Sequence, residues 1–568
     1  MKALPGLWLS SLLLLTVAAA RSHAEPAYDL LVRGGTIYDG SGGTPFVGDV
    51  GVRSDRIVYV GPRADGQAKQ TILAHGKAVA PGFINGMSHA TFSLLADGTA
   101  QSDLRQGVTL EIMGEGTTAG PLNAAQLAEL RADPRRRAAF KWQSLGEYLV
   151  GLEAQGTSLN FASWVGATTV RRHVLGDDNV APSTTQLEQM RELVRHAMEE
   201  GALGVASALG YAPAIFAGTD ELVALATEAG RCGGAYASHM RNEGDGLLES
   251  LEELIQIARR SGAPATVFHL KASGRDNWPK LATALQTISA ARAEGLRITA
   301  NMYPYTASAT GLDAAVPPWV QEGGATAFRQ RLADPLIRAR VIAEMKAPST
   351  AWDNEMRAAG GPAAVLLRSG QTLADVAKTL GVGGEEAALR IIEQDEGRPG
   401  AFYFTMSEAN LRQQILQPYV FLGSDLQAVT ITPQSLKSGA HPRAYGTFAR
   451  FLAKYVRDEK LLTLAEAVRR LTSLPAASYA IAERGRLRVG YFADLVIFDA
   501  ETVQDHASFD NAHRYATGVS HVVVNGALAL ADGELTAARV GRFVRGRGWK
   551  DGATGGCRAA AGDWPALN

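Results

Sequence analysis

The fold is decided by residues 221–270, ELVALATEAGRCGGAYASHMRNEGDGLLESLEELIQIARRSGAPATVFHL, in which two helical patterns each lead into a short apolar strand. Apolar residues recur at three- and four-residue spacing in both helical patterns, which is typical of helices with one buried face. The two strand-like runs end in His239 and His269. Alternation of helices and buried strands predicts a sheet with helices packed on it.

The same alternation continues on both sides of this stretch, in 160–169, 187–209 and 281–305. Its repetition over several hundred residues predicts an α/β fold with a (β/α)8 TIM-like barrel. A doubly wound sheet would carry a glycine-rich dinucleotide loop after its first strand, and the sequence has none there.

The two ends of the chain have a different texture, made of short alternating strands separated by turn residues. It occurs in 28–40, 49–61 and 77–85, and returns in 490–500 and 520–535. Two small β segments at opposite ends most simply pair with each other. We therefore expect a small β-sandwich domain formed by both chain ends, with the barrel inserted into it.

The alternation is lost between Leu312 and about Gly400, where helix-like pieces replace it. An insert of this length in a barrel loop is more often functional than structureless, so we expect a helical lid over the substrate side. The expected organisation is a signal peptide at 1–24, β-sandwich parts at 25–80 and 479–547, a barrel at 81–478 with an insertion at about 313–400, and a tail at 548–568.

Composition and charge exclude several classes of protein. The 568 residues are 46% hydrophobic and 20% charged, which is ample for a large core and a second domain. A formal net charge of −1 gives no overall field for a polyanion, so no nucleic-acid partner is expected. The one basic run, Arg539–Lys550, is interpreted as a solvated tail. One disulfide is possible, but we expect a buried Cys232 and an unpaired Cys557.

The N-terminus is typical of a secretory signal peptide, with Lys2 before an apolar run and a small-x-small sequence that ends at Ala24. The apolar run, Leu7–Ala20, is shorter than the roughly 20 residues that span a bilayer core. We therefore expect cleavage near Ala24, no stable membrane anchor, and an exported protein that is periplasmic or secreted.

Residues that can bind a metal follow several of the predicted strands. In a barrel the C-terminal ends of the strands converge on one face, so these residues can meet although they are far apart in sequence. Imidazole nitrogen and carboxylate oxygen are zinc ligands, and an open position holds the water that attacks a carbonyl. The candidates are His89, Glu115, His239, His269 and Asp425.

Each candidate also has a structural interpretation when it is taken alone. A histidine at a strand end is usually a hydrogen-bonded residue, and Glu115 and Asp425, each beside glycines, are also compatible with turns. Their joint placement at strand ends is what favours a metal site.

Ten motifs, in this order, resemble the amidohydrolase superfamily and specifically its D-aminoacylase (N-acyl-D-amino-acid deacylase) family. They are VRGGTIYDGSG, APGFIN, GVTLEIMGEG, SHMRNEGD, HLKASG, YPYTA, GSD, HPRAYGTF, RRLTSLPA and GYFADLVIFD. The resemblance covers nearly all of the chain from Tyr28 to about Arg547. It implies a β-sandwich from both chain ends, a barrel with a zinc site, and hydrolysis of the amide in N-acyl-D-amino acids, which are small-molecule partners.

The resemblance also implies roles for individual residues. Among the family's metal-binding positions, the pair of barrel histidines falls on His239 and His269, and the acid that ends the last barrel strand falls on Asp425. Where the family has a cysteine ligand in a glycine-flanked turn, this chain has Glu115, and a carboxylate can also ligate or bridge zinc.

The chain departs from the family most clearly after the APGFIN strand. The family pattern there is His-x-His, and the matching residues are Met87, Ser88 and His89. Since a thioether is a poor zinc ligand, we expect one zinc on Glu115, His239 and His269, with His89 nearby and a second metal weakly held at most.

In this interpretation Asp425 is the general base and acid, which takes a proton from the zinc water and delivers it to the leaving amine. Lys271, two residues after His269 on the expected strand face, is a candidate to bind or polarise the substrate. Arg443 is a candidate for the substrate carboxylate, with Tyr303 hydrogen-bonded to the same group.

Two other functions remain open on the sequence. One is another activity of the superfamily, such as a D-amino-acid or isopeptide dipeptidase or a cyclic-amide hydrolase. The other, from a different class, is a metal-poor binding scaffold. The acyl group, the side chain, the D or L preference and the oligomeric state are not predicted.

Overall fold

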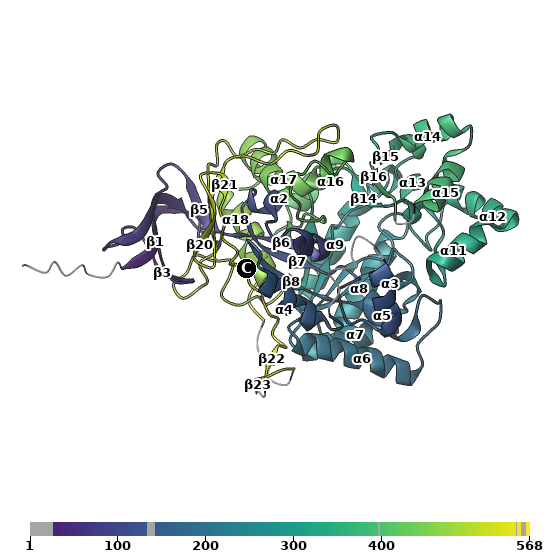
Figure 1. Cartoon of the computed structure of the whole chain (residues 1–568), viewed down its shortest axis with the longest axis horizontal. Helices are drawn as coiled ribbons and strands as arrows, with labels where there is room; N and C mark the ends of the chain where they lie inside the picture. Colours follow the sequence, from purple (N-terminus) through teal and green to yellow (C-terminus); the bar gives the residue numbers. More distant parts are fainter. Residues whose placement is uncertain (1–26, 133–141, 396–397, 553, 558–563, 568) are drawn as a thin grey trace, which may run out of the picture.

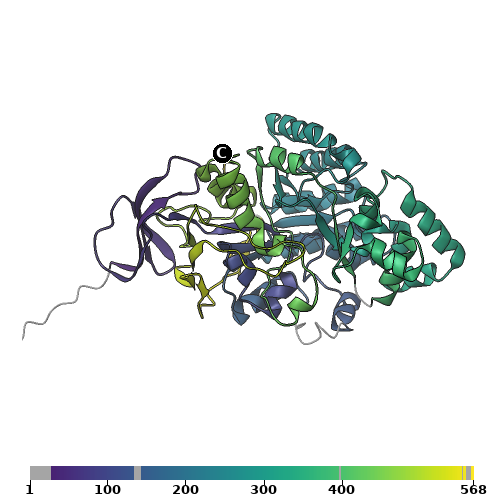
Figure 2. The ribbon, with the colours of Figure 1, turned by 90° about the horizontal axis from the view of Figure 1, so that it is seen from above.

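The computed structural model describes residues 27–132, 142–395, 398–552, 554–557 and 564–567. The predicted signal peptide lies outside the described residues. Strands from both chain ends form one end of the elongated molecule, a helix-surrounded barrel forms its centre, and the insertion forms the far end (Figures 1 and 2). Within the described residues, no helix is both long and apolar enough to cross a membrane.

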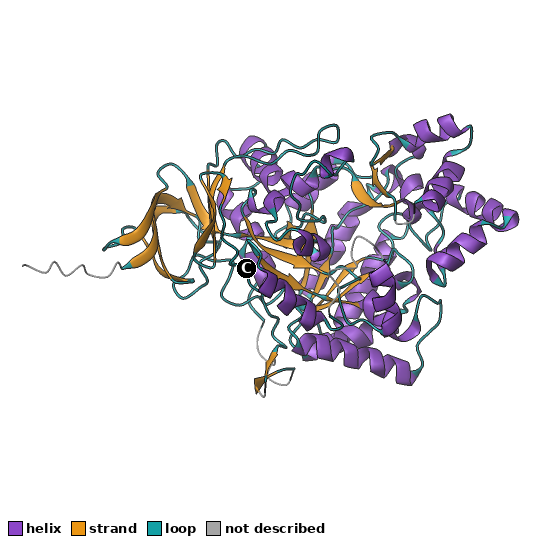
Figure 3. Cartoon of the chain, in the orientation of Figure 1, coloured by secondary structure: helices purple, strands orange, loops and turns teal. Residues whose placement is uncertain are grey.

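The centre is a barrel of parallel strands in two hydrogen-bonded sheets, of six and three strands, and Figure 3 shows these strands in orange among the helices. Its strands are β6 (Phe83–Ser88), β7 (Val108–Met113), β8 (Asn160–Ser163) continued by β9 (Val165–Gly166), β10 (Gly204–Ala208), β11 (Ala235–His239), β12 (Ala265–Val267), β13 (Ile298–Met302) and β17 (Val420–Leu422). Neighbours in this order pair in parallel, and Asp425 N donates to Met87 O at 3.0 Å where β17 meets β6. The predicted (β/α)8 barrel is confirmed.

Amphipathic helices cover the barrel because their apolar residues recur every three or four positions. In α8 (Leu247–Ser261) the buried positions include Leu247, Leu251, Leu254 and Ala258. The other helices around the barrel are α1 (Thr91–Ala96), α2 (Gln101–Leu104), α3 (Ala124–Ala132), α4 (Leu145–Gln155), α5 (Ala167–Leu175), α6 (Thr184–Glu199), α7 (Thr219–Arg231), α9 (Lys280–Ala293), α16 (Glu408–Ile415), α17 (Arg443–Arg450), the π-helical η6 (Phe451–Asp458), α18 (Leu464–Leu471) and α19 (Ser473–Ser478), with short 3-10 turns η1 (Ala214–Phe216), η2 (Arg275–Asn277) and η5 (Ser435–Lys437).

Strands from both chain ends form one nine-stranded sheet. They are β1 (Tyr28–Ile37), β2 (Phe46–Arg53), β3 (Arg56–Gly61), β4 (Ala68–Leu73), β5 (Ala78–Pro81), β18 (Leu495–Phe498), β19 (Val519–Val524), β20 (Ala527–Ala531) and β21 (Glu534–Leu535). The N- and C-terminal parts join where β5 pairs with β18. Val32 and Val52 share a buried core with Ile497 and Val523, so neither part is complete without the other.

The insertion has its own apolar core and contains strands that the sequence pattern did not predict. A small antiparallel sheet is formed by β14 (Ser308–Gly311), β16 (Gly400–Tyr403) and β15 (Val365–Leu367). The helical pieces are η3 (Leu312–Ala315), α10 (Pro318–Gln321), α11 (Gly324–Leu332), α12 (Pro335–Lys346), α13 (Glu355–Ala358), η4 (Pro362–Ala364), α14 (Leu373–Leu380) and α15 (Gly384–Gln394). The insertion is mainly helical, and its short strands were not predicted because strands of three or four residues are too short to show a period.

The C-terminal segment is not a solvated tail, which corrects the expectation for Arg539–Lys550. Phe543 and Val544 are buried, and Phe161 of β8 donates to Arg542 O at 3.1 Å and accepts from Val544 N at 2.8 Å. The segment ends in the short hairpin β22 (Lys550–Asp551) and β23 (Thr554–Gly555).

Cys232 is buried as expected, but the expectation of an unpaired Cys557 is wrong, because the two cysteines form a disulfide. Their separation of 325 residues gave no signal in the sequence. The C-terminal segment, which carries Cys557 to Cys232 at the end of α7, is what brings the pair together.

Candidate metal centre and active site

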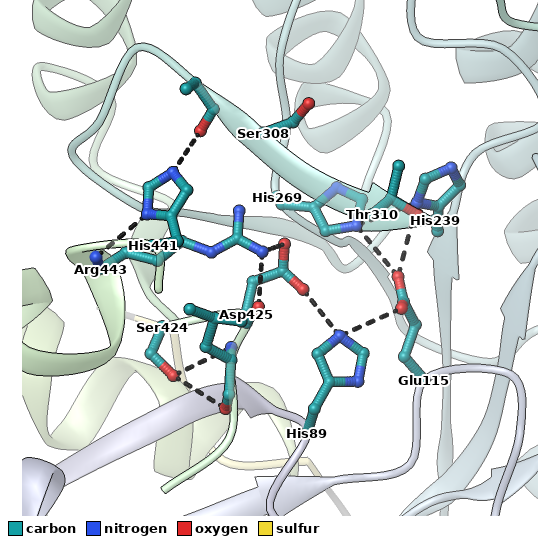
Figure 4. Close-up of polar contacts among 12 residues, drawn as sticks. His89, Glu115, His239, His269, Ser308, Thr310, Ser424, Asp425, His441 and Arg443 are labelled. Carbon is teal, nitrogen blue, oxygen red and sulfur yellow. Dashed lines mark hydrogen bonds and ion pairs between the residues drawn. The ribbon is translucent and has the colours of Figure 1, made fainter. Parts of the chain in front are cut away.

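The metal-type residues predicted from the sequence lie together at the C-terminal ends of the barrel strands (Figure 4). His89 follows β6, Glu115 follows β7, and His239 ends β11, while His269 and Asp425 come two and three residues after β12 and β17. The barrel topology therefore converts five distant sequence positions into one cluster.

One group of possible metal ligands consists of Glu115, His239 and His269. His239 Nδ1 lies 3.0 Å from His269 Nε2, and Glu115 Oε1 lies 3.0 Å from His269 Nε2 and 3.5 Å from His239 Nδ1. In a tetrahedral zinc site with bonds of about 2.0–2.2 Å, neighbouring ligand atoms are about 3.3–3.6 Å apart. The three donor atoms thus have nearly the spacing of three corners of such a site.

The second group consists of His89, Glu115 and Asp425. His89 Nε2 lies 2.9 Å from Asp425 Oδ1 and 3.6 Å from Glu115 Oε2. Glu115 therefore directs Oε1 toward His239 and His269 and Oε2 toward His89. Figure 4 shows its carboxylate between the histidine pair and His89. Met87 is buried in the apolar core and adds no donor, so the second group contains a single imidazole.

Unusual backbone conformations hold these side chains in place. His269 and Asp425 have φ of 32° and 49°, in the left-handed region that non-glycine residues seldom adopt. His269 N donates to Asn301 Oδ1 at 2.6 Å, which fixes this turn. Gly116, with φ of 66°, lies so close to Ala208 that an added Cβ would be 2.6 Å from the alanine methyl, which explains why the Glu115 turn carries glycine.

The electrostatics of the cluster suit a bound cation. Burial opposes ionisation of Glu115, but His239 and His269 beside it hold its pKa well below the ordinary value. Burial likewise opposes a charge on His269, and yet the surrounding carboxylates raise its pKa to about 9. The raised pKa favours a proton on His269 when no metal is bound, and a metal ion would displace that proton.

Asp425 is held in its ionised form. Burial alone would raise its pKa, but Arg443, His269 and His89 lower the pKa to about 2. Asp425 Oδ2 accepts from Arg443 Nη2 at 2.8 Å, on the side away from His89. A carboxylate that is ionised and next to the metal ligands can accept a proton from a bound water.

Glu243 is a site residue that the residue-by-residue sequence analysis missed. Its Oε1 lies 3.0 Å from His269 Nδ1 and its Oε2 accepts from Lys271 Nζ at 2.6 Å. A carboxylate on the outer nitrogen of a ligand histidine fixes the tautomer and orients the ring. The signal that was present is the SHMRNEGD motif, which carries this carboxylate four residues after His239.

Lys271 lines the cavity as expected, but not for the expected reason. β12 ends at Val267, so the alternation of a strand does not extend to Lys271. The loop instead brings Lys271 Nζ within 2.7 Å of His269 Nδ1, and the side chain is buried. Burial lowers its affinity for a proton, but Glu243 more than offsets this and raises the pKa of Lys271.

Arg443 and Tyr303 lie next to each other, with the guanidinium 4.2 Å from the ring centre. Tyr303 lines the cavity, whereas Arg443 lies behind Asp425 and is not part of the cavity wall. Arg443 Nε and Nη1 are buried and have no hydrogen-bond partner among the described residues. A direct contact between Arg443 and a substrate carboxylate therefore stays a prediction.

The cluster opens into a cavity of about 240 Å³. The insertion contributes part of its wall, and the sequence analysis named none of these residues because their position depends on how the insertion folds back. They are Ser308, Ala309, Thr310, Glu355 and Arg398, and they face Tyr211 from the barrel. A second, mainly apolar cavity of about 370 Å³ shares Ala309 and Thr310 with the first.

Comparison with known proteins agrees with this geometry. A model of the amidohydrolase family matches residues 70–529. N-acyl-D-glutamate deacylase from Alcaligenes xylosoxydans xylosoxydans is 32% identical over 523 residues, which are 91% of this chain and 96% of that protein. D-aminoacylase from the same organism is 32% identical over 527 residues, with 92% and 99% covered.

A solved structure shares the fold over nearly its whole length. It is N-acyl-D-glutamate deacylase from Bordetella bronchiseptica, complexed with zinc and a phosphonate inhibitor, with a TM-score of 0.75, 29% identity, and 91% of this chain and 99% of that chain covered. The chain therefore belongs to the amidohydrolase family, within the D-aminoacylase (N-acyl-D-amino-acid deacylase) group, and is a metal-dependent amidohydrolase.

Proposed function

We propose that the protein is an exported zinc-dependent hydrolase that cleaves the amide bond of N-acyl-D-amino acids. The observation that carries the proposal is the pair of donor groups that share Glu115, with Asp425 in its ionised form beside them. The names of the relatives support the substrate class, because they act on N-acyl-D-amino acids.

The residues present fit one zinc ion on Glu115, His239 and His269, since imidazole and carboxylate donors have the required spacing. When bound, zinc would lower the pKa of a water molecule and polarise the substrate carbonyl. The second donor group has one imidazole and two carboxylates, one of which is the proposed base. A second metal there would compete with proton transfer, so we propose that one metal is sufficient.

Asp425 is the proposed general base and acid. It accepts the proton of the attacking water and delivers it to the nitrogen of the leaving amino acid. His89, at 2.9 Å from Oδ1, and Arg443, at 2.8 Å from Oδ2, hold the carboxylate from both sides. These two contacts fix the direction in which Asp425 can receive and give the proton.

Lys271 and Tyr303 are the proposed contacts of the substrate carboxylate on the cavity wall, with Arg443 behind them. Lys271 is fixed by Glu243, and burial together with nearby carboxylates raises the pKa of Tyr303 to about 12, which keeps its hydroxyl available as a donor. A cyclic amide has no free carboxylate and would leave this wall without a partner. The wall therefore favours an N-acyl amino acid over a cyclic amide.

Export is supported by two features. The first 24 residues are typical of a signal peptide. The disulfide between Cys232 and Cys557 agrees with an oxidising compartment, where such bonds form and persist.

The test is a screen of the zinc-loaded enzyme against enantiomeric pairs of N-acetyl amino acids. Hydrolysis of the D member of each pair, with the L member at least about tenfold slower, supports the proposal. Turnover of the L members alone would contradict the assigned substrate class. Turnover of dihydrouracil or hydantoin alone would favour the cyclic-amide alternative.

A further inference from the structure

Arg398 is a cation on the wall of the metal cavity for which neither the family resemblance nor the proposed mechanism has a role. It lies two residues before β16, at the point where the insertion returns to the barrel. Its side chain is 48% exposed, whereas the side chains of Lys271 and Arg443 are 3% and 1% exposed. Arg398 lines both the metal cavity and a neighbouring pocket, and it is the most exposed of these three cations.

The guanidinium is held in a fixed orientation. Nε donates to Asp313 Oδ1 at 2.6 Å and Nη2 donates to Thr310 Oγ1 at 3.2 Å. Its carbon lies 4.7 Å from the centre of the Tyr211 ring, in the geometry of a cation–π contact. The arginine therefore loses little conformational freedom when it binds a ligand.

Part of the hydrogen-bonding capacity of Arg398 is unused. A guanidinium has five N–H groups, and the contacts to Asp313 and Thr310 use one on Nε and one on Nη2. No described residue accepts from Nη1. The Nη1 and Nη2 edge of a guanidinium is the part that binds a carboxylate with two parallel hydrogen bonds.

The position of Arg398 relative to the metal ligands limits which part of a substrate it can reach. The Tyr211 ring contacts both residues, with its centre 4.7 Å from the Arg398 guanidinium carbon and 4.8 Å from the centre of the His239 ring. The proposed contacts of the α-carboxylate, Lys271 and Tyr303, are instead near His269 and Asp425. A substrate that binds Lys271 and Tyr303 through its α-carboxylate and also forms an ion pair with Arg398 must carry a second anionic group.

We propose that Arg398 is a specificity-determining residue that binds a second carboxylate of the substrate, so that the enzyme prefers N-acyl-D-amino acids with two carboxylates. This inference rests on the proposed function. The second carboxylate has two possible sources, an acidic side chain and a dicarboxylic acyl group. A neutral apolar substituent would instead have to enter the neighbouring cavity beyond Ala309 and Thr310.

The experiment compares kcat and KM of the zinc-loaded enzyme for N-acetyl-D-glutamate, its neutral isostere N-acetyl-D-glutamine, and N-succinyl-D-glutamine. We expect the wild type to favour N-acetyl-D-glutamate or N-succinyl-D-glutamine over N-acetyl-D-glutamine. Arg398→Met should raise KM for the preferred dianion by about 10- to 100-fold, the usual effect of losing a charged hydrogen-bonded pair, with KM for N-acetyl-D-glutamine within about threefold. The dianion that responds identifies which end of the substrate carries the second carboxylate.

Two control variants separate recognition from folding. Arg398→Lys keeps the charge but not the two-pronged geometry, and should have an intermediate KM for the dianion. Arg338→Met removes another arginine of the insertion, paired with Glu386 at 2.8 Å and Glu393 at 2.7 Å away from the cavity, and should leave the preference unchanged. Equal kcat/KM of the wild type for dianions and N-acetyl-D-glutamine, or equal losses on both in Arg398→Met, would overturn the inference.

Binding calorimetry on the Asp425→Asn background separates this inference from the proposed function, because it measures recognition without turnover. Tighter binding of the dianion than of N-acetyl-D-glutamine, lost on adding Arg398→Met, supports the inference even if the wild type hydrolyses neither compound. Hydrolysis by the wild type without such a difference in binding would support the proposed function and contradict this inference.

Discussion

At the scale of single residues, the two carboxylates of the site have different proposed roles. Glu115 faces both donor groups and is the proposed zinc ligand, whereas Asp425 lies between His89 and Arg443 and is the proposed base. Both carboxyl groups have lowered pKa values, so ionisation does not distinguish their two roles. Their positions relative to the neighbouring side chains do.

Asp425→Asn tests this division. The amide cannot accept the proton of the attacking water, so kcat should fall by about 10²- to 10⁴-fold. The zinc content should remain near one equivalent, because Glu115, His239 and His269 are unchanged. Metal analysis and steady-state kinetics on the same preparation check both statements. A variant with zinc bound and kcat within tenfold of the wild type would show that another group is the base.

Metal binding should release a proton, because the pKa of His269 in the metal-free cluster is raised to about 9. At pH 7.5 this imidazole is mostly protonated, and a zinc ligand must be deprotonated. The apparent zinc affinity should therefore rise with pH up to about 9 and level off above it.

Calorimetric titration of zinc in buffers of different ionisation enthalpy measures the proton count. Release of about one proton at pH 7.5 and of much less at pH 9.5 is expected. A proton count that does not change between these two values would contradict the titration of His269.

The separate contributions of sequence and tertiary structure are clearest at this scale. Candidate zinc ligands at strand ends could be predicted from the sequence. An apolar run that ends in His239, or in the turn that carries Glu115, is a local pattern. Glu243, Tyr211 and Arg398 could not be assigned roles, because each acts through a neighbour that only the folded chain brings close. Arg443 could be named as a candidate, but not its place behind Asp425.

At the scale of elements, the start of the barrel contains a buried polar network under the site. Asn85 of β6 accepts from Ser424 N at 2.8 Å and donates to Ser424 Oγ at 2.8 Å, directly before Asp425. Its amide nitrogen also lies 3.0 Å from Glu111 Oε2 and 3.2 Å from Asp103 Oδ1. The asparagine of the APGFIN motif thus positions the turn that carries the proposed base.

Asp103→Asn should change how stability depends on pH. Burial raises the pKa of Asp103 to about 6, above the ordinary value near 3.9 of the unfolded chain. The folded protein then binds more protons than the unfolded chain between about pH 4 and 6, so this group lowers the free energy of unfolding as pH rises through that range, by about 3 kcal/mol in total.

The measurement is chemical denaturation of wild type and variant at pH 4 and pH 7. Relative to the wild type, Asp103→Asn should be about 3 kcal/mol more stable at pH 7 than at pH 4. A difference between the two proteins that is the same at both pH values would contradict the raised pKa.

Elements with a clear period were predicted, and those without one were not. The helices on the barrel and the strands at both chain ends have periods of about three and a half and two residues. The strands β14, β15 and β16 of the insertion are too short for this, and they are defined by pairing between distant residues, such as Ser308 with Tyr403 and Val365 with Tyr403. The pattern therefore gave no indication of the sheet in the insertion.

At the scale of the whole molecule, the chain ends determine how the parts are joined. The N-terminal strands pair with β18, and the C-terminal segment runs along the barrel to the Cys232–Cys557 disulfide. The sequence indicated the first connection, because the same pattern of short alternating strands occurs near both chain ends. It gave no indication of the second, because a single pair of distant cysteines has no spacing pattern.

The disulfide should stabilise the protein without affecting catalysis. A bond that closes a loop of 325 residues restricts the unfolded chain, which is typically worth about 2–4 kcal/mol. Cys557→Ser should therefore lower the thermal midpoint by a few degrees, with kcat and zinc content unchanged. Scanning calorimetry with and without reductant checks this, since reductant should affect the wild type only. An unchanged midpoint would mean that the C-terminal segment docks equally well without the bond.

The central claim is that one zinc ion on Glu115, His239 and His269 is sufficient for hydrolysis. Its most direct test is to titrate metal-free enzyme with zinc while following hydrolysis of an N-acetyl-D-amino acid, with Glu115→Gln in parallel. Activity should rise linearly to one equivalent of zinc and gain nothing from a second, and Glu115→Gln should stay inactive over the same range. Full activity without metal, a rise that continues to two equivalents, or normal activation of Glu115→Gln would contradict the claim.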